Sequence, residues 1–191
     1  AGSGLTTGSN NIAIGQNALG ANTTADDNIA IGKQALTATT TGYGNTSIGR
    51  YSMMTNTTGY FNSAFRYNSL LANTTGDSNV ALGMYALSAN TTGIRNIGIG
   101  YNATGANTTA QGNVGIGHTA LSVNTTGQYN TSVGSYSMLA NTTAANNTAI
   151  GSSTLRANTT GASNTASGYK ALYANTTGVN NTALGVEALD A

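Results

Sequence analysis

Few side chains in this chain could act as acids, bases or metal ligands. The acids are Asp26, Asp27, Asp77, Glu187 and Asp190, and there is no cysteine. Asp26 and Asp77 occupy the same position of a 17-residue repeat, three copies apart. In repeats stacked like neighbouring strands, that separation is about 14 Å. It is too wide for the two carboxylates of a glycoside hydrolase, so we expect no catalytic residues and no enzyme.

His118 is the only histidine, so one chain cannot assemble a catalytic triad or a multi-histidine metal site. A three-fold axis could gather three copies of it. Otherwise we expect its side chain to be exposed or stacked in a ladder. The glycines follow the repeat, and no glycine-rich loop leads into a helix, as phosphate-binding motifs require. We therefore expect no cofactor and no metal site.

The charge pattern and hydropathy exclude two classes of partner. The six basic residues are scattered singly and the formal net charge is +1, whereas nucleic-acid binding needs clustered cations. No signal peptide, lipidation motif or long apolar run is present, so we expect no direct membrane insertion by this segment. Low charge with regularly placed apolar residues also disfavours intrinsic disorder.

The strongest candidate for a specific binding site lies between residues 43 and 67, where aromatic and guanidinium groups concentrate. Exposed aromatic rings beside arginine suit glycan or protein surfaces. The alternative is that these residues thicken the core or a subunit interface. Tyr43 and Tyr60 share one position in successive copies, so we expect their rings to stack. The candidate site residues are Tyr43, Arg50, Tyr51, Tyr60, Phe61, Arg66 and Tyr67.

The elements that must position these side chains are set by the repeat. Eleven copies of 17 residues fill residues 5–191 without an insertion or deletion, leaving residues 1–4 as a leading segment. A strict period of this size is typical of stacked supersecondary units. The last copy lacks the polar closing segment of a capped solenoid, so we expect an excerpt of a longer fibre. The copies begin at Leu5, Asn22, Thr39, Asn56, Asn73, Asn90, Asn107, Asn124, Asn141, Asn158 and Asn175.

Each copy contains one short strand pattern. Segments such as Val80-Ala81-Leu82 place large aliphatic residues two apart, with a small residue between them. This alternation predicts a β-strand that buries the larger side chains on one face and is closely approached on the other. An Ala-Leu pair such as Ala86-Leu87 predicts a second short strand or extended edge. A helix is disfavoured because each candidate would be short, contain glycine and lie between Asn-Thr-Thr-Gly segments.

Two glycine positions carry different expectations. The glycine after the strand is present in ten copies, with Arg66 in the remaining one. It indicates a positive φ or a tight contact between copies. The glycine after Thr-Thr is replaced by Ala25, Ala110 and Ala144, so we expect an ordinary turn there.

The asparagine that precedes each strand is invariant. Stacked copies would align these residues into a ladder whose amides bond to one another and to corner backbone groups. The Asn-Thr-Thr triplets are formal glycosylation sequons, but stacked so closely they cannot all carry glycans, and we interpret these asparagines as structural caps. The predicted ladder is Asn11, Asn28, Asn45, Asn62, Asn79, Asn96, Asn113, Asn130, Asn147, Asn164 and Asn181.

Together these patterns predict an all-β parallel β-solenoid or β-roll of eleven 17-residue coils, about 50 Å long at the usual strand spacing. Each coil offers only about two large apolar side chains, for example Ile31 and Leu36. A single rod would therefore have a narrow core. Burial against identical neighbours in a closed homo-oligomer would solve this problem.

The motifs resemble a known family. Asn-x-Ala-Ile-Gly followed by Ala-Leu is similar to the YadA-like head repeats of trimeric autotransporter adhesins, and the Asn-Thr-Thr-Gly form to repeats of bacterial and phage fibre proteins. The resemblance implies a homotrimer of left-handed β-rolls, displayed on a cell surface or extracellularly, with a virion fibre as the alternative. One difference is that those heads commonly repeat nearer 14 residues. The matching segments here are 11–15, 28–32, 45–49 and 147–151.

The function expected from this resemblance is attachment, through a non-enzymatic adhesin head that contacts glycans or proteins of a target surface. Two alternatives stay open. One is a purely structural spacer of a phage tail fibre. The other is ice binding through stacked threonines, although adjacent residues of a strand point to opposite faces, so only one Thr column would face outward unless the pair lies in a turn.

Overall fold

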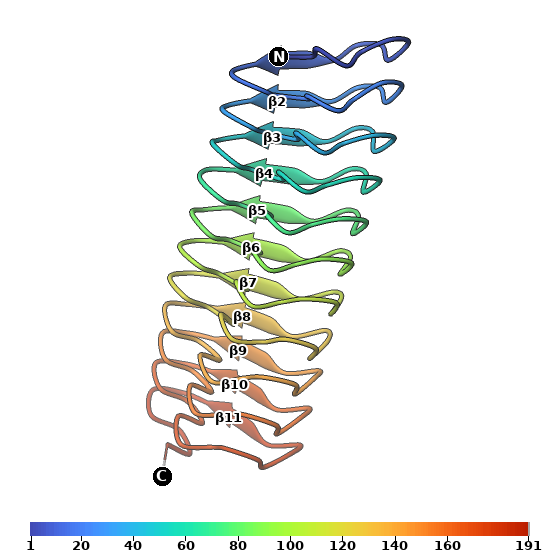
Figure 1. Cartoon of the computed structure of the whole chain (residues 1–191). Helices are drawn as coiled ribbons and strands as arrows, with labels where there is room; N and C mark the ends of the chain where they lie inside the picture. Colours follow the sequence, from blue (N-terminus) through green and yellow to red (C-terminus); the bar gives the residue numbers. More distant parts are fainter. Residues whose placement is uncertain (191) are drawn as a thin grey trace.

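The computed structural model describes residues 1–190, and the chain forms a single elongated rod with its two termini at opposite ends (Figure 1). One three-residue strand per coil stacks directly on the next, and no helix occurs within residues 1–190. The predicted β-solenoid is confirmed. The strands are β1 (Ile12–Ile14), β2 (Ile29–Ile31), β3 (Thr46–Ile48), β4 (Ser63–Phe65), β5 (Val80–Leu82), β6 (Ile97–Ile99), β7 (Val114–Ile116), β8 (Thr131–Val133), β9 (Thr148–Ile150), β10 (Thr165–Ser167) and β11 (Thr182–Leu184).

The eleven strands form one parallel sheet in sequence order, and each residue pairs with the residue one repeat further along. Ala81, for example, pairs with Gly98, and Gly98 pairs with Gly115. The turns stack in the same way, because backbone hydrogen bonds also join successive coils outside the strands, as from Leu87 N to Ala103 O at 3.1 Å. Every position of the repeat therefore becomes a file parallel to the rod axis.

The direction of the strand side chains differs from the prediction. The small middle residue of each strand points into the rod and is fully buried from β2 to β9, whereas the larger flanking residues point outward. The exposed fractions of Ile14, Leu82 and Ile150 are 58%, 44% and 47%. The prediction that the larger side chains are buried was wrong because the interior is too narrow for them. A Cβ added to Gly98 would lie 2.9 Å from the carbonyl oxygen of Ala103 on the opposite wall.

The Ala-Leu segment is a turn, not the second strand or extended edge that the sequence suggested. The leucine lies in the left-handed region, with φ of 50° at Leu87 and 53° at Leu121. This conformation directs the side chain into the rod, where it fills the space opposite the strand. A short strand there would have placed alternate residues outward and left the interior empty.

The glycine after the strand fulfils both of its expected roles. Gly83 and Gly100 have φ of 152° and 126°, and a Cβ on Gly83 would overlap the carbonyl group of Gly100. Arg66 occupies this position in one coil with φ of 101°. The glycine after Thr-Thr has no positive φ, as predicted for an ordinary turn.

The core is a single file of large apolar side chains, one per coil, backed by small residues. It is interrupted in the middle of the rod by Thr104, which separates a buried cluster ending at Leu87 from one beginning at Leu121. The strands beside Thr104 carry Gly98 and Gly115 in place of alanine or serine. A Cβ at either position would lie 2.6 Å and 2.8 Å from Thr104 Oγ1 and Cγ2 respectively. These two glycines therefore make room for the branched side chain.

The predicted asparagine ladder is present. Asn96 donates from its backbone N–H and from Nδ2 to Asn79 Oδ1, at 2.9 Å and 3.2 Å, and Nδ2 also donates to Ala110 O at 2.8 Å. The asparagine of Asn-Thr-Thr builds a second ladder. Asn90 Nδ2 donates to Asn73 Oδ1 at 2.9 Å and to Gly93 O at 3.0 Å, and Gly93 O also accepts from Asn79. The two ladders thus meet at one corner carbonyl, and both are buried through most of the rod.

Candidate functional site

The seven candidate residues lie in two separate places, on either side of the strands. Tyr43, Tyr60 and Phe61 belong to the pre-strand corner, which we define as the two residues before each ladder asparagine. Arg50, Tyr51, Arg66 and Tyr67 belong to the post-strand corner, the three residues after each strand. The strand's outward side chains lie between the two corners, so the predicted site is not one continuous patch.

The pre-strand corner holds a compact aromatic cluster. The rings of Tyr43 and Tyr60 stack as predicted, with centroids 5.4 Å apart and planes 6° apart. Phe61 packs edge-on against both, at 5.2 Å and 5.5 Å. Phe61 has a positive φ of 54°, and its ring also covers Gly44 in the coil before. The cluster is confined to two coils and is flanked by the carboxylate of Asp77.

The post-strand corner carries an uninterrupted row of six rings, which we call the aromatic file. It consists of Tyr51, Tyr67, Tyr85, Tyr101, His118 and Tyr136, one from each of six successive coils. Neighbouring centroids are 6.0, 5.7, 6.1, 5.3 and 5.3 Å apart. Most contacts are edge-to-face, and Tyr101 and His118 are stacked, with 17° between their planes. His118 is therefore exposed and also stacked in a ladder, the two environments expected for it.

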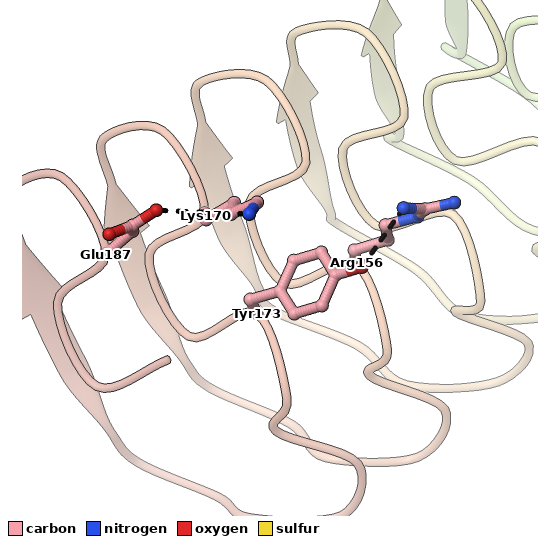
Figure 2. A network of polar contacts seen from close by, with 4 residues as sticks. All are labelled: Arg156, Lys170, Tyr173 and Glu187. Atoms are coloured by element: carbon pink, nitrogen blue, oxygen red, sulfur yellow. Dashed lines mark hydrogen bonds and ion pairs between the residues drawn. The ribbon is translucent and has the colours of Figure 1, made fainter. Parts of the chain in front are cut away.

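Cations lie at both ends of the aromatic file. At one end the Arg50 guanidinium lies 4.5 Å from the ring centroid of Tyr51. At the other end Arg156 lies 5.6 Å from the Tyr136 centroid, and its Nη1 donates to Tyr173 Oη at 3.1 Å. Lys170 continues the row over Tyr173 at 5.6 Å (Figure 2). Its ammonium also lies 3.9 Å from a carboxylate oxygen of Glu187, so the far end is partly neutralised.

Tyr51 in the post-strand corner and Tyr60 in the pre-strand corner have neighbours of opposite charge. Arg50 Nη2 donates to Tyr51 Oη at 2.8 Å, and this hydrogen bond to the phenolate form lowers the pKa of Tyr51. In the pre-strand corner, hydrogen bonding to the Asp77 carboxylate stabilises the neutral phenol and raises the pKa of Tyr60. Tyr51 therefore lies beside a cation, and Tyr60 lies beside an anion.

A shallow open cavity of about 520 Å³ adjoins the aromatic file. It is lined by Arg66, Leu82, Gly83, Met84 and Tyr101, which come from three successive coils. Leu82 belongs to the outer face of β5 and Tyr101 to the file, so the cavity connects the strand's outer face with the row of rings. Its wide opening suits an extended ligand better than an enclosed small molecule.

The two threonines of each Thr-Thr pair differ in their contacts and exposure. The first threonine donates to a carbonyl of the next coil, as from Thr74 Oγ1 to Thr91 O at 3.1 Å. The second threonine is exposed in every coil, for example at Thr75 and Thr92. The sequon asparagines from Asn56 to Asn158 are fully buried, which confirms their structural interpretation and leaves no access for a glycan.

Neither a metal site nor a membrane span is found among residues 1–190. No group of three or more His, Cys, Asp or Glu side chains comes together in this part of the chain. The described residues also contain no helix long and apolar enough to cross a bilayer. The titratable residues that do cluster are those of the two corners.

Sequence reasoning found Tyr51 and Tyr67 but missed the other four rings of the file. Tyr67, Tyr101 and His118 are the second residue after the strand in their coils, whereas Tyr51, Tyr85 and Tyr136 are the third. No single position of the repeat is therefore consistently aromatic. Considering the two adjacent positions together would have revealed the row, because at least one of them is aromatic or histidine in each of these six coils.

No protein-family model, curated protein or solved structure matches this chain.

Proposed function

We propose that this chain is a non-enzymatic segment of a surface fibre, in which three copies pack through their strands and present their corners for attachment. The number three and the location on a cell, virion or other extracellular surface come from the resemblance of the repeats to trimeric adhesin heads. The packing through the strands is supported by the outer face of the sheet. The attachment role is supported by the exposed rings of the corners.

The observation that carries this proposal is the apolar outer face of the sheet. The last residue of the strand is apolar in ten of the eleven strands, with Ser167 in β10 as the exception. These side chains form a continuous file and are half-buried or exposed in the single chain. A long file of Ile, Leu, Val and Phe in contact with water is typical of an unfilled interface. A second copy of the same face is a matching occupant, because it has the same coil spacing.

The oligomer is tested by placing charges on the strand face. The parent chain should sediment at about three times 19.0 kDa. The double variant Ile99→Glu and Ile116→Glu should be a folded monomer. It should fold because both side chains point outward, and it should not associate because a trimer would bury the new carboxylates between copies. The matched control places the same charges on the outward threonines, Thr92→Glu and Thr109→Glu, and should remain trimeric. A folded parent monomer would contradict the oligomer and weaken the adhesin proposal.

Ice binding is the second candidate, and one observation favours it: the outward threonines form a regular file with one hydroxyl and one methyl per coil. A single file is narrower than a flat two-dimensional array, so we rank this function below attachment. The test is thermal hysteresis. A clear freezing-point gap, abolished by Thr75→Lys and Thr92→Lys, would replace the attachment proposal.

A further inference from the structure

We propose that the aromatic file binds a linear acidic polysaccharide, with the polymer extended along the rod axis. This inference deepens the proposed function, since it assigns a ligand class to the attachment surface. It is carried by three observations: a continuous row of rings, cations at the two ends of that row, and an open cavity beside its centre.

The row of rings matches the form of an extended sugar chain. The six rings span five coil steps, about 24 Å at the usual strand spacing, and the rod holds them at a fixed interval. The C–H groups of a pyranose carry partial positive charge, which suits the negative face of an aromatic ring. Tyr101 and Tyr136 have exposed fractions of 43% and 40%, so ring surface is available although the rings also contact one another.

The cations indicate that the polymer is acidic. Arg50 lies at the beginning of the file and Arg156 at its end, and Arg66 lines the cavity between Leu82 and Tyr101. None of these guanidinium groups has a carboxylate partner within salt-bridge distance among residues 1–190. Carboxylates or sulfates of a polysaccharide would pair with these guanidinium groups, since Arg presents a planar fork of donors.

A single-stranded nucleic acid fits this surface less well. Its bases bind by stacking on open ring faces, with a backbone that follows closely spaced cations. Here the centroids of neighbouring rings are 5.3 to 6.1 Å apart, so no base can enter between them. The coils between Tyr67 and Tyr136 also offer no Lys or Arg in the post-strand corner. A sugar chain can lie over the row without entering between the rings, so it avoids the first problem.

The central experiment measures binding to immobilised alginate, a linear uronate polymer, with carboxyl-reduced alginate and oligothymidylate as comparison probes. The parent should bind alginate, and binding should weaken with added salt because exposed charge pairs are screened. Binding to carboxyl-reduced alginate and to oligothymidylate should be at least about tenfold weaker. An alginate oligomer long enough to cover several coils should compete, whereas a disaccharide should not.

Two matched pairs of variants locate the site. Tyr101→Ser with Tyr136→Asn removes two file rings. Serine occupies the equivalent position at Ser135 and Ser152, and asparagine tolerates the positive φ of Tyr136. The control, Tyr43→Ser with Tyr60→Ser, removes two exposed rings from the pre-strand corner. We expect about tenfold weaker alginate binding for the first pair and no change for the control.

A second set of variants removes arginines at the ends of the file and compares them with an arginine outside it. Arg50→Gln with Arg156→Gln should reduce alginate binding and its salt dependence, whereas Arg95→Gln, in the pre-strand corner, should change neither. Circular dichroism and sedimentation should show that every variant keeps the fold and oligomer of the parent. Equal loss in the test and control pairs, undiminished binding without the file rings, or preference for oligothymidylate would overturn the inference. A monomeric parent that binds alginate through the file would contradict the trimer alone.

Discussion

The inward and outward sides of the coil follow different rules. Inward positions repeat almost unchanged along the rod: two asparagine ladders, a small residue in the strand and one leucine or methionine in the turn. The two corners change from coil to coil, whereas the outward threonines do not. The post-strand corner, for example, passes from Lys33 through six rings to Glu187. Stacking therefore constrains the inward side, whereas the corners are free to carry surface chemistry. Thr104 is the clearest exception on the inward side, because it replaces the leucine or methionine of the turn.

The largest expected effect comes from emptying the core file. Leu87→Ala removes a fully buried side chain that packs beneath the strands, and we expect a loss of about 2–5 kcal/mol in the free energy of unfolding. The control in the same coil is Met84→Ala, whose side chain is exposed and should change stability by about 0.5 kcal/mol or less. Denaturant titration measures both. Equal losses would show that the inward side has no special role.

The next effect concerns the asparagine ladder. Asn96→Ala and Asn113→Ala each remove an amide whose oxygen accepts from the backbone N–H of the next coil's asparagine and whose nitrogen donates to a corner carbonyl. Leaving those backbone groups unpaired should cost about 1–3 kcal/mol per substitution. Thr92→Ala, which changes an exposed polar residue nearby, should be close to neutral. Melting temperatures like that of the parent in both Asn variants would mean that the ladder does not hold the coils together.

A smaller and more specific effect is expected at Thr104. Gly98→Ala would place a Cβ 2.6 Å from Thr104 Oγ1, and relieving that contact should cost about 1–3 kcal/mol. In the background of Thr104→Ala the same change should be nearly neutral. The coupling free energy from this double-mutant cycle measures how far the two positions depend on each other. Equal costs in both backgrounds would contradict the steric explanation.

The smallest effect concerns the pKa values of one tyrosine in each corner. The pKa of Tyr51 should lie below the ordinary value of 10.0 and that of Tyr60 above it. Arg50→Gln should raise the pKa of Tyr51, because the phenolate loses its hydrogen-bond donor. Asp77→Asn should lower the pKa of Tyr60, because the neutral phenol loses a charged acceptor. Ring-carbon NMR titration follows each tyrosine, and shifts in the opposite directions would refute the assigned contacts.

The features predicted correctly from the sequence are those that every copy repeats. The 17-residue coil, the strand position, the asparagine ladder and the turn glycine follow from one rule applied eleven times. The sequence did not predict which face of the strand points into the rod, because alternation distinguishes two faces without showing which one is buried. The Leu87 side chain decides which face is buried. It fills the interior opposite the strand and leaves room there only for a small residue such as Ala81. The aromatic file was missed because Tyr67 and Tyr85 occupy different positions of the repeat.

The left-handed residues have a consequence for how the chain could change its length. Each coil holds about three non-glycine residues at positive φ, such as Ser78, Tyr85 and Leu87 in one coil, each disfavoured by about 1–2 kcal/mol in isolation. A coil is therefore stable only on a neighbour that already has this shape. Recombination that adds or removes whole 17-residue units preserves every ladder, whereas other insertions or deletions misalign them. Such changes in the gene lengthen or shorten the rod in steps of about 4.8 Å, and the contacts between neighbouring coils stay the same.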